Sequence, residues 1–106
     1  MTRTIDALEH LLQQSKDGKF VLRLYAAGMT PQSTRAIENL RAICEKHLKD
    51  RYDLTVIDIY QEPDRAQEEQ VVAAPTLVKT LPLPLRRLIG DLSDRKRVLL
   101  ALGIEP

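Results

Sequence analysis

The sequence is poor in aromatic residues: it has no tryptophan, one phenylalanine and three tyrosines among 106 residues. Because hydrophobic residues still make up 43% of the chain, its core must rest on leucine, isoleucine, valine and alanine. This length and this apolar share suit one compact domain with one core. The scarcity of aromatic rings also removes the stacking platform on which single-stranded nucleic acids commonly bind. We therefore expect no nucleic-acid partner.

Signals for secretion and membrane insertion are also missing. The single cysteine, Cys44, has no second thiol with which to form an internal disulfide. Arg3, Asp6 and Glu9 interrupt the apolar segment that a secretory signal would need. No apolar run approaches the roughly 20 residues that cross a bilayer as a helix. These absences predict a cytoplasmic protein with no membrane partner.

Catalytic motifs are lacking as well. The glycines are isolated from one another, so none forms a phosphate-binding loop; they are Gly18, Gly28, Gly90 and Gly103. The acidic residues after the second predicted strand look like helix-start and surface charges; they are Glu62, Asp64, Glu68 and Glu69. We expect no catalytic residues and no cofactor.

Cys44 and His47 form a Cys-x-x-His pair, which raises the question of a metal site. A closed zinc site needs four ligands, and His10 is the sole further histidine. Both residues of the pair fall on the apolar side of a predicted helix. Core packing is therefore the expected role, and no metal site is predicted.

Charge is present but unevenly distributed. The formal net charge is only +1, which argues neither for nucleic acid nor for a membrane surface. Residues 79–97 nevertheless hold six basic and two acidic side chains, a local charge of +4. A run of this kind is usually a solvated face, and it can also be a surface that recognises an acidic partner.

The first part of the chain predicts a βαβ unit. Apolar residues at helical spacing indicate a short helix over 4–15, within an N-terminal extension of residues 1–18 that precedes a domain of residues 19–106. Alternation predicts a strand over 20–25, with the side carrying Phe20 buried. Thr30 and Pro31 suit the start of a helix that runs to about 49. A β-branched strand over 53–59 should then lie parallel to the first.

The second part predicts a short helix, a hairpin and a final helix. Pro63 starts an acidic helix that extends to Gln70, and a strand begins over 74–78. Leu81–Pro84 cannot continue a central strand, because each proline lacks a backbone donor, so we expect a turn there. A fourth strand over 85–89 would close an antiparallel hairpin.

The last segment is ambiguous. Ser93 can cap a helix, Ala101 favours its interior, and Gly103 suits its left-handed end. The same apolar run also fits a buried strand.

The resulting order, β-α-β-α-β-β-α, is the thioredoxin-like arrangement of an α/β protein. Pro75 stands where that fold usually has a cis proline. A redox enzyme of this fold would need a thiol where the first strand meets the first helix. Residues 27–31 contain none. A thioredoxin-fold redox protein, or an adaptor with a different signalling partner, is kept as the alternative.

Four stretches, taken together and in order, resemble the KaiB family of small partners of the KaiC ATPase in bacterial circadian timing. The resemblance covers roughly residues 20–102 and rests on YAAGMTP (25–31), VID (56–58), PTL (75–77) and LPLPLRRLIGDLS (81–93). One such match arises easily by chance, whereas four in order do not. The resemblance implies a non-enzymatic regulator that binds a KaiC-like ATPase ring and modulates its phosphorylation or signalling output.

The same resemblance implies that the fold can switch. KaiB proteins bind KaiC as a thioredoxin-like monomer, and a resting form rearranges the C-terminal half and assembles as a homodimer or homotetramer. The residues associated with this switch and with the cis proline are Pro75, Pro82, Pro84, Ala101 and Gly103. Clock-type members carry glycine and aspartate in the last element, where this chain has Ala101 and Gly103. Since glycine costs about 0.5–1 kcal/mol in a helix interior, Ala101 predicts a more populated thioredoxin-like form.

Basic residues are the predicted partner contacts. The resemblance favours Lys79 and Arg87 on or beside the hairpin, and less strongly Arg86 and Arg35. It also suggests that the edge strand over 54–59 could accept a KaiA-like partner, with a histidine kinase as a further possibility.

Overall fold

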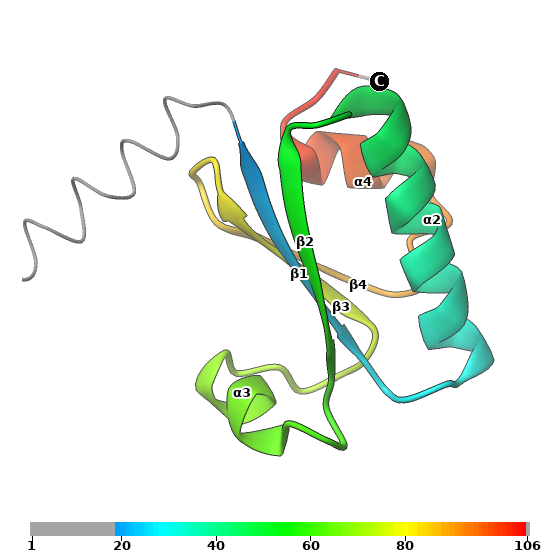
Figure 1. The fold of residues 1–106 in the computed structure, drawn as a ribbon, viewed down its shortest axis with the longest axis vertical. Coiled ribbons are helices and arrows are strands. Elements are labelled where there is room, and N and C mark those ends of the chain that lie inside the picture. Colours follow the sequence, from blue (N-terminus) through cyan, green and yellow to red (C-terminus); the bar gives the residue numbers. More distant parts are fainter. Residues whose placement is uncertain (1–18, 106) are drawn as a thin grey trace, which may run out of the picture.

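The computed structural model describes residues 19–105 and shows one mixed sheet with helices on both sides (Figure 1). The predicted helix over 4–15 lies outside the described residues. The elements, in chain order, are β1 (Phe20–Ala26), α2 (Pro31–His47), β2 (Tyr52–Asp58), α3 (Pro63–Glu68), β3 (Thr76–Leu81), β4 (Arg86–Ile89) and α4 (Arg95–Leu102). This order confirms the predicted thioredoxin-like arrangement.

The four strands form a sheet in the order β2-β1-β3-β4. β1 pairs with β2 in parallel, with Leu24 opposite Val56, and with β3 in antiparallel, with Leu24 opposite Leu77. β3 and β4 form the antiparallel hairpin. Both faces of β1 are buried, at Leu24 and at Tyr25, because helices cover both sides of the sheet, although alternation alone predicted one buried face.

Helix α2 begins where its sequence predicts. Thr30 is the N-cap, its hydroxyl accepts the Ser33 amide at 3.3 Å, and Pro31 follows as the first helical residue. The Ser33 hydroxyl in turn accepts the Ala27 amide at 2.9 Å, which ties the helix start to the end of β1. The helix ends at His47, two residues before the predicted limit, and Asp50 turns the chain with a φ of 63°.

The helices divide unequally between the two faces of the sheet. Helices α2 and α4 lie on one side, and α3 lies on the other (Figure 1). The larger core fills the side under α2 and α4, and among its buried members are Leu22, Leu24, Ala36, Leu40, Cys44, Leu77, Val98, Leu99 and Leu102. The α3 side has only a small cluster of four buried residues, Tyr25, Ile57, Ala66 and Val78. Most of the apolar stabilisation of the domain therefore comes from one layer.

The proline-rich segment is a turn between β3 and β4, as predicted, except that Leu81, expected in the turn, is the last residue of β3 and pairs with Val21. Its X-Pro bonds before Pro82 and Pro84 are cis, and so is the bond before Pro75, as the fold suggested. The strands are shorter than predicted at their starts: β3 begins at Thr76 and β4 at Arg86.

The ambiguous last segment is helix α4, and its N-cap differs from the prediction. Asp94 caps the helix, with its carboxylate accepting the Arg97 amide at 3.2 Å. Ser93 does not cap it: this residue belongs to the preceding turn, where its amide donates to Asp91 Oδ1 at 3.0 Å. None of the helices within residues 19–105 is long and apolar enough to cross a membrane.

The C-terminal end of α4 was predicted correctly. Gly103 has the left-handed φ of 78°, and its amide donates to the Leu100 carbonyl at 3.0 Å. The Ile104 amide reaches back to the Leu99 carbonyl at 2.8 Å. This pair of bonds is a Schellman motif, which satisfies two carbonyls that the helix end would otherwise leave free.

Candidate partner-binding surface

The β3–β4 hairpin carries three of the four predicted contact residues. Arg86 and Arg87 are exposed on β4, whereas Lys79 lies on β3 directly opposite Arg86. Because adjacent strand residues point to opposite faces, the two arginines leave the hairpin on different sides. The sequence predicted one basic patch, whereas the structure places Arg86 and Arg87 on opposite sides of the hairpin.

Lys79 differs from the other bases because its side chain is buried. It lies on the same face of β3 as Leu77 and Leu81, and only 3% of the residue is exposed. Burial, and secondarily the nearby positive charge of Arg86, lowers the pKa of Lys79. Burial leaves Lys79 little surface for a partner in this fold, and its contact with one stays a prediction.

Arg87 faces the opposite side of the sheet, towards the turn after α3. Its guanidinium donates to the Gln70 carbonyl at 3.5 Å. Gln70 itself has a φ of 58°, which marks the tight turn at this point. Arg87 therefore links the hairpin to the α3 side while remaining available to solvent.

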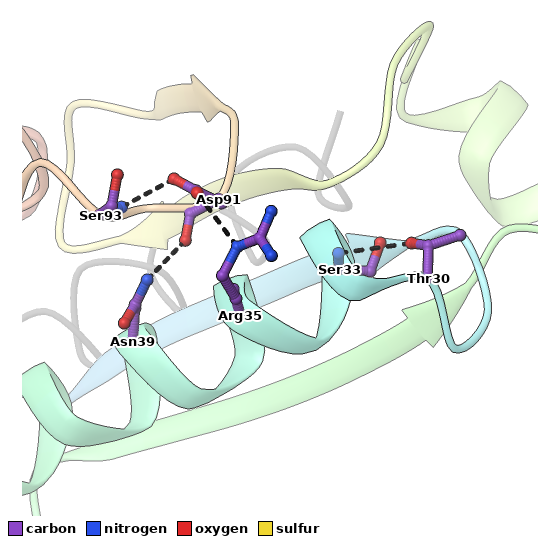
Figure 2. A network of polar contacts seen from close by, with 6 residues as sticks. All are labelled: Thr30, Ser33, Arg35, Asn39, Asp91 and Ser93. Atoms are coloured by element: carbon purple, nitrogen blue, oxygen red, sulfur yellow. Dashed lines mark hydrogen bonds and ion pairs between the residues drawn. The ribbon is translucent and has the colours of Figure 1, made fainter.

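Arg35 belongs to a polar network between α2 and the loop after β4 (Figure 2). Its Nε lies 3.4 Å from Asp91 Oδ2, and the amide of Asn39, one turn further along α2, donates to the Asp91 carbonyl at 2.9 Å. The Arg35 side chain is nevertheless 58% exposed, so it can still meet a partner. The network fixes the loop that leads from β4 into α4.

Asp91 is the acceptor at the centre of this network. Its carboxylate accepts the Ser93 amide, and hydrogen bonds from Ser93, followed by those of Arg35, lower the pKa of Asp91. Sequence analysis singled out Arg35 but not Asp91, Asn39 or Ser93 as its neighbours. The sequence contained one usable signal, because Asp-x-Ser is typical of a turn in which the aspartate caps its own backbone.

β2 lies at the edge of the sheet, as the sequence predicted. Within residues 19–105 it pairs with β1 alone, and Val56 is 37% exposed. An unpaired strand edge of this kind is geometrically able to accept another strand. Whether a partner uses it stays a prediction.

Cys44 is a core residue, whereas His47 is only half-buried. Cys44 is fully buried, and burial, with a smaller effect of Glu45, raises the pKa of its thiol to about 11. His47 instead faces Arg95, with its Nε2 at 3.3 Å from the guanidinium. Over residues 19–105 no three acidic, histidine or cysteine side chains gather closely enough to hold a metal ion. The expected packing of Cys44 is confirmed.

An apolar groove beside α3 was missed by the sequence analysis. It is lined mainly by apolar side chains of this helix and of the segments on either side of it, namely Pro63 and Ala66 on α3 and Ile59, Tyr60, Val71 and Val72 beside it. Tyr60 is 72% exposed and Val72 is 92% exposed. The sequence pattern did not predict that Tyr60 and Val72 are exposed, because each follows an apolar residue, Ile59 or Val71, that packs inwards.

The family follows from comparison with known proteins. Residues 23–104 match the KaiB domain, and this range includes all four predicted basic contacts and the whole hairpin. The chain belongs to the KaiB family. KaiB proteins are clock regulators rather than enzymes, in agreement with the prediction of a non-enzymatic role.

The alignments cover most of the length of the KaiB relatives. The circadian clock oscillator protein KaiB of Prochlorococcus marinus is 51% identical over 85 residues, which are 80% of this chain and 81% of that protein. The circadian clock protein KaiB3 of Synechocystis sp. is 47% identical over 88 residues, 83% of this chain and 86% of the relative.

Solved structures show the same fold at lower identity. The N-terminal domain of Synechococcus elongatus SasA has a TM-score of 0.66 and 24% identity, covering 80% of this chain and 84% of that domain. Chloroplastic thioredoxin z has a TM-score of 0.67 and 17% identity, covering 90% and 87%. Unlike a redox thioredoxin, this KaiB-family chain has no cysteine at residues 27–31, and its one thiol is in the core.

Proposed function

We propose that this KaiB-family protein binds a KaiC-type ATPase ring and modulates its phosphorylation or signalling output. The observation that supports it is the family match over residues 23–104 together with two exposed arginines on a stiff hairpin. Arg86 and Arg87 are the proposed direct contacts, and Arg35 is a further one next to Asp91. Lys79 would act from beneath, by supporting the strand that presents Arg86.

Electrostatic recognition explains why exposed arginines suit this role. Complementary charges across an interface raise the association rate and select the correct partner more than they raise affinity. A guanidinium also binds a carboxylate through two parallel hydrogen bonds, which fixes orientation. The proposed partner surface is therefore acidic where it meets β4.

Two further assemblies are proposed besides the complex with the ATPase ring. The open edge of β2 suits strand addition by a KaiA-like or histidine-kinase partner, and the family resemblance suggests a homodimer or homotetramer of the resting form. Neither is needed for the binding of the ATPase ring.

Sedimentation velocity with the KaiC-like ATPase from the same source, in ATP and in ADP, tests the proposal. We expect the wild-type protein to co-sediment and Arg86→Ala/Arg87→Ala to lose most of the complex. The matched control is Lys46→Ala, which removes an exposed base from the last turn of α2. Absence of a complex with either nucleotide would refute the partner, and equal losses in the control would refute the site.

A further inference from the structure

The apolar groove beside α3 has a packed floor and an exposed rim. Ala66 is buried in the small cluster on this side of the sheet, and Ile59 and Val71 pack against that cluster. Tyr60 and Val72 line the same groove, yet they are 72% and 92% exposed. The groove has a volume of about 540 Å³, within the range of ligand sites in proteins. A ligand that covered these two side chains would bury apolar surface that now meets water.

The chain around Tyr60 holds this side of the groove in place. The Tyr60 amide donates to Asp58 Oδ1 at 2.9 Å. Its ring lies against Gly28, since a methyl group on this glycine would be 3.6 Å from Tyr60 Cδ2. An aromatic side chain that is already positioned loses little conformational entropy when a ligand covers it.

The segment that leads from the groove to β3 offers backbone groups as well. Residues 72–74 belong to neither a helix nor a strand. Among the backbone–backbone hydrogen bonds within residues 19–105, none uses the amide or the carbonyl of Val72 or Ala74. An extended peptide can pair with such groups through its main chain while its side chains enter the adjoining groove.

Acidic side chains flank the groove on α3. Asp64 and Glu68 are exposed and lie two positions from Ala66 on either side, so they do not share its face of the helix. Residues 57–72 hold five acidic side chains and one basic one, a local charge of −4. Arg87 approaches from the hairpin, where it donates to the Gln70 carbonyl at 3.5 Å. On balance these surroundings favour a basic ligand and disfavour an acidic one.

We propose that the apolar groove beside α3 binds an extended peptide segment of a partner protein, in which apolar side chains are flanked by lysine or arginine. The apolar side chains fill the groove between Tyr60 and Val72, and the main chain pairs with residues 72–74. The basic side chains lie beside Asp64 and Glu68. This chemistry is the reverse of the acidic surface that the arginines of β4 require, so the inference does not depend on the proposed ATPase contact.

NMR titration of the nitrogen-15-labelled full chain with a synthetic peptide tests the proposal. The probe has Val-Leu-Phe-Val at its centre, two lysines on each side and blocked termini. We expect it to shift the amide signals of Gln67, Val72 and Ala74. One comparison peptide has glutamates in place of the lysines, and another has Ser-Gly-Ser-Gly at its centre. Both should bind on the order of tenfold more weakly than the probe.

Variants of the protein test the groove itself. Tyr60→Ser and Val72→Ser each remove an exposed apolar side chain, so the core stays intact. The matched control is Leu100→Ser, which removes a side chain that is 67% exposed on α4, on the opposite side of the sheet (Figure 1). The groove variants should bind the probe on the order of tenfold more weakly, and the control should bind it like the wild type.

Three results would overturn the proposal. The groove signals could stay in place at millimolar probe, the three peptides could bind equally well, or the control could lose as much binding as the groove variants. A fourth result would change the occupant. If the same signals shift with protein concentration in the absence of peptide, a second copy of this chain fills the groove, and the proposed partner segment is wrong.

Discussion

Arg35 Nε and Asp91 Oδ2 lie 3.4 Å apart although 56 positions separate the two residues in the sequence. The contact joins the second turn of α2 to the loop that leads from β4 into α4 (Figure 2). Asn39 reinforces it by donating to the Asp91 carbonyl at 2.9 Å. One aspartate thus holds the entry to α4 against α2.

Asp91→Asn should make the protein less sensitive to acid. The pKa of Asp91 is lowered in the fold, first by Ser93 and then by Arg35. Its ionised form therefore contributes stability above the ordinary aspartate pKa, and this contribution disappears as the pH falls through the lowered value. Urea unfolding over the acid range should show a shallower loss of stability in Asp91→Asn than in the wild type.

The control for Asp91 is Asp53→Asn, which changes an exposed aspartate on β2. Its curve should follow that of the wild type. If Asp91→Asn also follows the wild type, the network does not couple the loop to folding.

Leu40→Ala should destabilise the domain by about 2–5 kcal/mol, because it empties a fully buried position where α2 packs on the sheet. Leu100→Ala makes the same chemical change on α4 at a side chain that is 67% exposed. We expect that variant to stay within about 0.5 kcal/mol of the wild type. Urea titration with far-UV circular dichroism gives both values. Similar losses in the two variants would contradict the assignment of the core to one side of α2.

Ala101→Gly should weaken α4 by about 0.5–1 kcal/mol, since glycine has more backbone freedom to lose in a helix. Carbon-13 chemical shifts of residues 95–102 measure the helical population directly. We expect wild-type shifts to be helical and those of Ala101→Gly to move towards the coil values. Strand-type shifts in the wild type would contradict the prediction that this chain favours the thioredoxin-like form.

Cys44 should be nearly inert towards thiol reagents in the native protein. At a pKa of about 11 its thiolate at pH 8 is roughly one part in a thousand, and the side chain is also fully buried. Labelling with a maleimide should therefore be slow in buffer and rapid in concentrated urea. Rapid labelling of the native protein would mean that α2 leaves the sheet frequently.

Most of the secondary structure could be predicted because the signals were local. Thr30 and Pro31 mark the start of α2, Gly103 marks the end of α4, and the prolines mark the hairpin turn. The cap of α4 was missed because Ser93 and Asp94 are both good N-caps. In the fold the Asp94 carboxylate accepts the Arg97 amide, and Ser93 belongs to the preceding turn.

The candidate site was harder to predict than the fold. A count of bases over residues 79–97 could not show that Arg86 and Arg87 leave opposite faces, nor that Lys79 is covered. The position of Lys79 between Leu77 and Leu81 was a signal of its burial, since strand residues two apart share a face. The partner of Arg35 had no local signal, because it comes from the other end of the chain.

The position of β1 between β2 and β3 has a consequence for how the chain is made. As the protein leaves the ribosome, β1 can pair with β2 once residue 58 has emerged, but its other edge waits for β3 at residues 76–81. Until then the nascent chain presents an unpaired strand edge with Leu22 and Leu24 uncovered by β3 and α4. Such an edge is a site of aggregation. When β3 of the hairpin emerges and pairs with β1, it completes the sheet and removes the free strand edge through which the nascent chain could aggregate.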